Sequence, residues 1–267
     1  MITSSQNPKL KLARALQGRA RERYEQGAFL AEGVRLVEEA VNRQWGVRFV
    51  LYDETLSERG KSLVESLGTR GVACEEISPS LMQSLGDTET SQGLLAALDY
   101  SLLPIPHSLN FILIPDQVRD PGNLGTLIRT AAAAGVQAVL LPPETTDAFA
   151  PKVVRAGMGA HFRLPIQALG WDEIERVCKQ AGLQVFLADM AGPACWETDF
   201  RIPTALVVGG EATGASQAAR KSANTMVGIP MPGETESLNA GVAGAILMFE
   251  VVRQRSTSNF QHSNRET

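Results

Sequence analysis

The most constraining feature of this sequence is a series of strongly apolar strand candidates that alternate with helix-like segments after residue 110. The segment NFILIPD is a continuous apolar run, as expected of a strand buried on both faces. Further strand candidates read AVLLPP, QVFLAD, TALVVGG and TMVGIPM, and helices are expected from about 123 to 135 and at 171–182, 215–222 and 238–254. Such alternation implies right-handed crossovers. The sequence therefore predicts an α/β fold with a parallel sheet flanked by helices.

The first hundred residues predict a smaller α/β unit. Helix candidates at KLKLARALQGRARERYEQG, EGVRLVEEAVNRQ, SERGKSLVESLGTRG and PSLMQSLGDTE alternate with strand candidates at VRFVLYD, VACEEIS and QGLLAALDY. Residues 101–110 read SLLPIPHSLN, and their two prolines and lack of periodicity indicate a linker. We expect domains at 1–100 and 111–255, the linker at 101–110 and a disordered polar tail at 256–267.

The distribution of charged residues along the chain indicates whether it binds nucleic acid. The net charge of −4 argues against an indiscriminate nucleic-acid binder, yet residues 1–24 hold six basic side chains against one acid. This basic arm either contacts RNA phosphates, with Lys9, Lys11 and Arg14 as candidates, or is a solvated amphipathic helix. No apolar run approaches the ~18 residues of a membrane span. The three cysteines and three histidines lack metal-ligand spacing, so we expect a cytoplasmic protein with reduced thiols and no metal.

Three polar, glycine-containing loops follow three of the predicted strands. They read DQVRDPGNLGTLIRT, VVGGEATGAS and IPMPGETESLNAG. Ligands of parallel α/β sheets bind at the carboxyl ends of the strands, so we expect the three loops to share one pocket. The glycines of the second loop, at 209, 210 and 214, do not form a dinucleotide fingerprint, and there is no P-loop lysine. A phosphate-bearing cofactor, and with it a nicotinamide-dependent oxidoreductase, is therefore disfavoured.

Each polar residue of these loops also has a simpler explanation. Asn123 and Glu211 would serve as helix caps, and a lone helical arginine such as Arg129 usually forms a surface ion pair. Ser237 and Asn239 would cap the last helix. Because three such loops follow three strands of one domain, a shared functional site is the better interpretation.

The three loops carry a resemblance to a known family. The segments NLGTLIRTAAAAG, LVVGGEATGAS and IPMPGETESLNAGVAGAILMFE resemble, in order, the three motifs of the SpoU (TrmH-like) RNA 2′-O-ribose methyltransferases of the SPOUT superfamily. The segments ITSSQNPKLKLARAL, FLAEGVRLVEEA and QGLLAAL resemble the L30e-like RNA substrate-binding domain found in many members. The resemblance implies a homodimer, a trefoil knot in the C-terminal domain, and S-adenosyl-L-methionine as methyl donor to a ribose 2′-hydroxyl.

The resemblance also assigns roles to individual residues. The implied cofactor-binding positions are Ala188, Gly209, Ile229 and Leu238, and the implied catalytic positions are Asn123, Arg129, Glu211, Ser237 and Asn239. Family proposals make Arg129 the general base, but a guanidinium stays protonated in proteins. Binding the neighbouring phosphate and stabilising the developing alkoxide is a physically easier role for it, and makes it an RNA contact as well.

The sequence departs from the family pattern at a few positions. Gly157 stands where many relatives carry serine, NAGVAG is smaller than the usual run after the asparagine, and Gly210 occupies a variable position. No motif loses a polar group, so activity is expected. We favour ribosomal RNA as substrate. The alternatives are a transfer-RNA methyltransferase and a non-catalytic RNA-binding protein of the same fold, which would not need to bind the cofactor.

Overall fold

The computed structural model describes residues 2, 4, 6–86, 92–211, 214–233 and 236–263, with only the backbone given for 257–263. The chain forms two compact units. Unit one comprises Met1–Ser101 and Asp147–Arg163, and unit two comprises Leu102–Thr146 and Leu164–Thr267. The segment 147–163 lies within the range that the sequence pattern assigned to the second domain, but its contacts place it in unit one.

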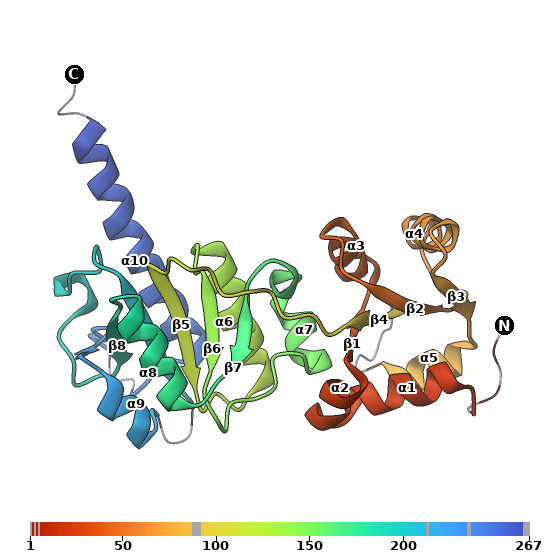
Figure 1. Cartoon of the computed structure of the whole chain (residues 1–267), viewed down its shortest axis with the longest axis horizontal. Coiled ribbons are helices and arrows are strands. Elements are labelled where there is room, and N and C mark those ends of the chain that lie inside the picture. Colours follow the sequence, from red (N-terminus) through yellow and green to blue (C-terminus); the bar gives the residue numbers. More distant parts are fainter. Residues whose placement is uncertain are drawn as a thin grey trace. The chain divides into compact units, whose positions relative to one another are not determined.

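Unit one is built on a four-stranded sheet in the order β1-β4-β2-β3. Strand β4 runs antiparallel to β1 and β2, and β3 is parallel to β2. In Figure 1 the elements of unit one that precede residue 101 run from red to yellow along the sequence, and α7 is green. The elements are α1 (Pro8–Gln17), α2 (Ala20–Gln26), β1 (Ala28–Glu32), α3 (Val34–Asn42), β2 (Val47–Tyr52), α4 (Glu58–Thr69), β3 (Ala73–Glu76), α5 (Pro79–Leu85), β4 (Leu94–Asp99), α7 (Pro151–Gly157) and the 3-10 turn η1 (Ala160–Phe162).

Among the described residues of the first hundred, the structure confirms the predicted helices and strands with two differences. The first helical segment breaks after Gln17 into α1 and α2, and the strand β1 was not predicted. The basic arm is also partly internal, since Arg23 is buried. Its guanidinium donates to the carbonyl oxygens of Leu16 (2.6 Å) and Gly18 (3.1 Å) and pairs with Asp147 (2.6 Å). Arg23 therefore has a structural role within unit one and is not available to bind RNA.

The segment 147–163 completes the aromatic core of unit one. Phe149 and Phe162 lie 5.0 Å and 6.4 Å from the ring of Phe29 on β1. His161 is buried beside them, and burial lowers its pKa to about 4. Its Nε2 bonds to the carbonyl oxygen of Ala148 at 2.8 Å, whereas Nδ1 has no partner among the described residues. The imidazole is thus neutral and donates from Nε2.

The same imidazole explains one departure from the family pattern. A Cβ at Gly157 would lie 2.5 Å from His161 Cε1, closer than side chains approach. A serine at this position would require His161 to move.

Unit two is built on a six-stranded, fully parallel sheet in the order β10-β8-β9-β5-β6-β7. The parallel fold predicted from the alternating pattern is confirmed, with one additional short strand, β7. The elements are β5 (Phe111–Asp116), α6 (Pro121–Ala133), β6 (Ala138–Leu141), β7 (Ile166–Ala168), α8 (Trp171–Gln180), β8 (Gln184–Ala188), the 3-10 turn η2 (Cys195–Glu197), β9 (Thr204–Gly209), α9 (Gln217–Ser222), β10 (Thr225–Val227) and α10 (Ala240–Ser263).

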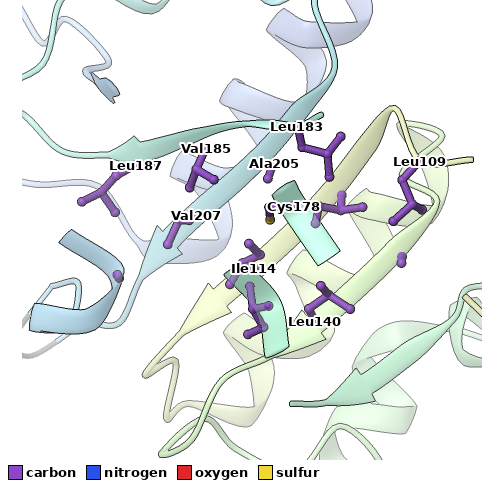
Figure 2. Close-up of a cluster of buried hydrophobic side chains, with 13 residues drawn as sticks. Leu109, Ile114, Leu140, Cys178, Leu183, Val185, Leu187, Ala205 and Val207 are labelled. Carbon is purple, nitrogen blue, oxygen red and sulfur yellow. The ribbon is translucent and has the colours of Figure 1, made fainter. Parts of the chain in front are cut away.

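Helices cover both faces of this sheet (Figure 1), with α8 and α9 on one side and α6 and α10 on the other. The α8 and α9 side holds a buried cluster in which alternate residues of the four inner strands meet Ile174, Cys178 and Ala219 of the two helices. Figure 2 shows part of this cluster, with Val185 and Val207 on neighbouring strands and Cys178 facing them. Because both faces are buried, the strands read as continuous apolar runs.

Helix α10 lies close against α6 because its first turns are built from small residues. A Cβ at Gly244 would lie 2.2 Å from Leu127 Cδ2, and one at Gly241 would lie 3.2 Å from Thr126 Cγ2. The small NAGVAG run therefore matches close helix packing. The helix continues to Ser263, into the range predicted to be a disordered tail, and residues 264–267 lie outside the described residues. Among the helices that the structure describes, none combines the length and apolar character needed to span a bilayer.

Candidate active site

The candidate site lies where β5 and β9 end side by side. Asp116, the last residue of β5, is paired in register with Gly209, the last residue of β9. From β5 the sheet continues along the sequence to β6 and β7 on one side, while β9 and β8 lie on the other. This reversal of strand order leaves a crevice between the loops that follow the two strands. The first two polar loops of the sequence leave the sheet at this crevice.

Asn123 does not cap α6, contrary to the simpler explanation of its position. The cap is Asp120, whose carboxylate accepts a hydrogen bond from the backbone N–H of Asn123 at 2.8 Å, and the helix begins at Pro121. The side-chain amide of Asn123 is therefore available for contacts outside its own helix.

That amide joins the three loops in one hydrogen-bonded chain. Asn123 Nδ2 donates to Glu211 Oε1 at 2.6 Å, and Asn123 Oδ1 accepts from Asn239 Nδ2 at 2.8 Å. Asn239 Oδ1 in turn accepts from the backbone N–H of Val242 at 3.2 Å, so Asn239 caps α10. A carboxylate only accepts and a backbone N–H only donates, so the two ends fix the orientation of both amides. We call Glu211, Asn123 and Asn239 the amide relay.

A cavity of about 600 Å³ opens beside the relay. Its walls include all four predicted cofactor-binding residues and three of the predicted catalytic residues: Ala188, Gly209, Ile229 and Leu238, and Glu211, Ser237 and Asn239. Asn123 contacts the cavity wall through its two relay partners. The structure thus brings the three loops together, as the sequence pattern predicts.

Two consecutive glycines allow the second loop to pack directly on neighbouring backbone. A Cβ at Gly210 would lie 2.0 Å from the carbonyl oxygen of Gln117, and one at Gly209 would lie 2.6 Å from the backbone nitrogen of Ala215. Any side chain at Gly210 would therefore push the second loop away from the first. In this chain the position requires glycine, although it varies in the family.

Asp116 is a site residue that the sequence pattern did not single out. It is fully buried, and its carboxylate accepts from Ser216 N at 2.6 Å and from Ser216 Oγ at 3.2 Å. Ser216 Oγ also accepts from the backbone N–H of Ala219, which caps α9. The Asp116 carboxylate therefore fixes the C-terminal end of the second loop relative to the sheet. The sequence feature that could have identified Asp116 is its place as a carboxylate at the end of the continuous apolar run FILIPD.

Asp189 carries the same signal after β8, and it lines the cavity. Its carboxylate accepts from the backbone N–H of Ala191 at 3.0 Å and from Arg220 Nη1 at 2.7 Å. The bond from Ala191 and then the Arg220 guanidinium lower the pKa of Asp189. The cavity therefore has one wall with an ionised carboxylate held in place by an arginine.

Arg129 lies apart from these groups. It is exposed on α6, does not line the cavity, and makes no hydrogen bond or ion pair with another described residue. The surface ion pair that would explain a lone arginine is therefore not formed within the described chain.

The three predicted RNA-binding residues of the basic arm lie on α1 of unit one. Lys9 forms an ion pair with Glu75, whereas Lys11 and Arg14 have exposed side chains. Lys9 is thus engaged within the protein.

Comparisons with known proteins agree with this geometry. The SpoU rRNA Methylase family matches residues 110–249, and the MRM3-like substrate binding domain matches residues 7–96. The chain is 34% identical to the 23S rRNA (guanosine(2553)-2′-O)-methyltransferase RlmP of Bacillus subtilis, over 94% of this chain and 98% of that protein. It is 31% identical to the 23S rRNA (uridine(2479)-2′-O)-methyltransferase of Streptomyces viridochromogenes, over 94% and 92% of the two chains.

Solved structures give the same result. The SpoU methyltransferase AviRb from Streptomyces viridochromogenes, crystallised in complex with the cofactor AdoMet, superposes with a TM-score of 0.83 at 32% identity, over 94% of this chain and 98% of that one. An AdoMet-bound rRNA methyltransferase from Sinorhizobium meliloti superposes with a TM-score of 0.83 at 31% identity, over 94% and 97% of the two chains.

Proposed function

Because the chain belongs to the SpoU rRNA Methylase family, we propose that it is an S-adenosyl-L-methionine-dependent methyltransferase that modifies a ribose 2′-hydroxyl of ribosomal RNA. The observation that carries the proposal is the amide relay, which unites the three loops of the family pattern beside a single cavity. Relatives that match nearly the whole chain are named 23S rRNA 2′-O-methyltransferases, which favours ribosomal over transfer RNA.

The residues of the cavity suit S-adenosyl-L-methionine. Ile229 and Leu238 offer apolar walls for a flat ring, and Gly209 contributes backbone to the same lining. The walls contain the carboxylates of Asp189 and Glu211, and the guanidinium of Arg220, which also lines the cavity, is paired with Asp189; this arrangement fits a cationic ligand without phosphate. When bound, this cofactor supplies a methyl group activated by its sulfonium centre. Ala188, Gly209, Ile229 and Leu238 are the residues that would hold it.

The relay residues position the acceptor hydroxyl. Asn239 is fixed by the Val242 N–H and by Asn123, and Ser237 lines the same cavity two residues earlier. Ser237 and Asn239 would hold the ribose 2′-hydroxyl in line with the methyl group, which lowers the entropic part of the barrier. Glu211 keeps Asn123 in the orientation that Asn239 requires, so Asn123 and Glu211 support the acceptor site rather than exchange protons.

Arg129 supplies positive charge to the RNA. A guanidinium remains protonated, so Arg129 cannot readily serve as a base. Its exposed position on α6, without a partner among the described residues, leaves its donors available for the phosphate beside the target ribose. There it would stabilise the alkoxide charge that develops as the hydroxyl loses its proton.

A homodimer is part of the proposal. Val242, Ile246 and Phe249 stand at helical spacing on α10 with 47%, 40% and 49% of their surface exposed. The opposite side of α10 is buried, with Leu247 and Met248 fully covered. One helix thus has a second apolar face, which a partner chain would cover.

The remaining features of the proposal follow the family. Residues 1–100 would form an L30e-like domain that binds the RNA substrate through Lys11 and Arg14, and residues 111–255 the methyltransferase domain. Helix α10 packs against α6 and β9 although it follows β10, at the sheet edge, and this return path supports a trefoil knot. The three cysteines form no disulfide, and we propose a cytoplasmic location.

The test measures methyl transfer from radiolabelled S-adenosyl-L-methionine to 23S rRNA, 16S rRNA and transfer RNA, followed by ribose-methylation mapping of the labelled RNA. We expect label at a single 2′-position of ribosomal RNA. Arg129→Ala should lower turnover by about 10²–10³-fold. Calorimetry should find unchanged cofactor binding, because Arg129 does not line the cavity. Label in transfer RNA alone would favour a transfer-RNA methyltransferase. RNA binding that does not depend on the cofactor, without methyl transfer, would favour a non-catalytic RNA-binding protein of the same fold.

A further inference from the structure

A second cavity lies within unit one, between the start of α3 and the end of α7. It has a volume of about 410 Å³, within the range of small-ligand pockets. Its wall is formed by Glu32, Gly33, Arg35, Leu36, Gln92, Arg155 and Met158. None of the predicted site residues belongs to this wall. We call it the unit-one pocket.

The described polar residues in the wall of the unit-one pocket carry net positive charge. Arg155 Nη1 lies 3.4 Å from Glu32 Oε2, a long contact that uses part of its donor capacity. Arg35 is exposed at the pocket mouth and donates no hydrogen bond to another described residue. Among the described residues of the wall, two guanidinium groups thus stand against one carboxylate. Guanidinium groups bind phosphate oxygens through paired hydrogen bonds.

The apolar part of the pocket contains a methionine in an unusual conformation. Met158 ends α7 with φ of 48°, in the left-handed region where helix ends usually carry glycine or asparagine. Its side chain is 52% exposed, so packing within the unit does not account for it. Together with Leu36 it presents a polarizable apolar surface beside the two arginines. An exposed, strained apolar residue beside cationic groups points to a ligand that is part flat ring and part anion.

The remaining wall supplies hydrogen-bonding groups. Gly33, with φ of 99°, turns the chain from β1 into α3, and its N–H donates to the carbonyl of Leu94 at 2.9 Å. A Cβ there would lie 2.8 Å from Gln92 Oε1, so the glycine lets the Gln92 amide pack over this turn at the pocket. Gln92 offers a donor and an acceptor, and Glu32 offers acceptors, to the edge of a base.

We propose that the unit-one pocket binds one unpaired nucleotide of the RNA substrate. Arg35 and Arg155 bind its phosphate, Leu36 and Met158 contact its base, and Gln92 reads the base edge. Single-stranded RNA is recognised in this way, with unstacked bases held on side chains and phosphates held by arginine. This inference rests on the proposed function, since it takes RNA as the substrate of this chain.

The first experiment measures filter binding of radiolabelled 23S rRNA between about 50 and 200 mM salt. Arg35→Gln and Arg155→Gln should weaken binding, and each should reduce the slope of log K against log salt by about 0.7–0.9, as expected for one lost phosphate contact. Arg70→Gln is the matched control, since Arg70 is an exposed arginine of unit one outside the pocket wall. If Arg35→Gln and Arg155→Gln keep the slope and affinity of Arg70→Gln, the proposal is wrong.

The second variant separates binding from folding. Met158→Gly relieves the left-handed strain and should therefore keep or raise the melting temperature, yet it should weaken RNA binding about fivefold or more through lost apolar contact with the base. Wild-type affinity in this variant, with the arginine variants impaired, would limit the pocket to phosphate and sink the nucleotide assignment.

Calorimetry on the same variants should find wild-type binding of S-adenosyl-L-methionine. Failure of the proposed function would appear instead in the wild-type protein, as absent cofactor binding or absent methyl transfer.

Discussion

Replacing Gly210 with alanine tests whether the contact between the first two loops sets the geometry of the active site. The added Cβ would lie 2.0 Å from the carbonyl oxygen of Gln117 and 2.7 Å from its carbonyl carbon. Real Cβ atoms do not approach other heavy atoms within 3.0 Å, so the gap to the oxygen must open by at least about 1 Å. Gln117 cannot easily yield, because its own N–H is bonded to Thr145 Oγ1 at 3.0 Å.

The displacement of the second loop in Gly210→Ala would separate the hydrogen-bonded residues of the amide relay. Glu211, the next residue, accepts from Asn123 at 2.6 Å, and an opening of about 1 Å would leave that pair beyond normal hydrogen-bond distance. A misplacement of this size costs about 10²-fold in rate, so we expect single-turnover methyl transfer by Gly210→Ala to fall by about that factor. Overpacking should cost about 1–3 kcal/mol of stability, or roughly 2–12 °C in melting temperature, so the variant remains folded in the assay.

The third loop offers a matched control. A Cβ at Gly233 would meet no atom of the described residues within 4 Å, so Gly233→Ala adds the same methyl group without a clash against them. It should transfer methyl groups at close to the wild-type rate. Should Gly210→Ala react within about threefold of Gly233→Ala, the packing of the second loop on the first would not control the site.

Three further outcomes follow from single contacts. Asp116→Asn leaves one oxygen to accept from the Ser216 N–H and puts an amide donor where the other oxygen accepts from Ser216 Oγ, so calorimetry should give a Kd for S-adenosyl-L-methionine about fivefold higher. An unchanged Kd would show that the carboxylate does not hold the loop. The folded-state pKa of His161, about 4, lies below the ordinary 6.5, so its contribution to stability is complete above pH 6.5 and declines by up to about 3 kcal/mol as pH falls to 4. His161→Leu should remove that part of the pH dependence in urea unfolding, and identical profiles for the two proteins would contradict it. Ile246→Asp places a charge on the exposed apolar face of α10 and should give the mass of a single chain in sedimentation equilibrium, whereas a persisting dimer would place the subunit interface elsewhere.

The parallel sheet and the position of the site could be predicted because both depend on local patterns. The strand β5 reads FILIPD, which no exposed strand or surface helix would carry, and the polar loops follow directly on such runs. Sequence alternation therefore predicted which residues end at the same edge of the sheet. Gly209, Ile229, Leu238 and Ser237, which the family resemblance assigned to the site, line one cavity at this edge.

The partners of individual side chains could not be predicted in the same way. Asn123 has the sequence of a helix cap, and only Asp120 and the distant Glu211, 88 residues later, determine that it serves the relay instead. Arg23 belongs to a basic segment that the sequence analysis interpreted as an RNA-binding arm or a solvated helix. Its ion-pair partner, Asp147, follows 124 residues later in the sequence. Contacts of this length depend on the assembled fold, and no local spacing encodes them.

The late arrival of residues 147–163 has a consequence for biosynthesis. As a nascent chain leaves the ribosome, Phe29 and Arg23 emerge early, but Phe149 and Asp147 emerge only after the segment Leu102–Thr146 of unit two has been translated. The buried guanidinium of Arg23 cannot pair with Asp147 before that residue is synthesised, so unit one completes its folding only after translation has passed residue 163. For the same reason, proteolytic cleavage between residues 101 and 110 would not release an intact unit one, because residues 147–163, which complete its core, would remain in the C-terminal fragment.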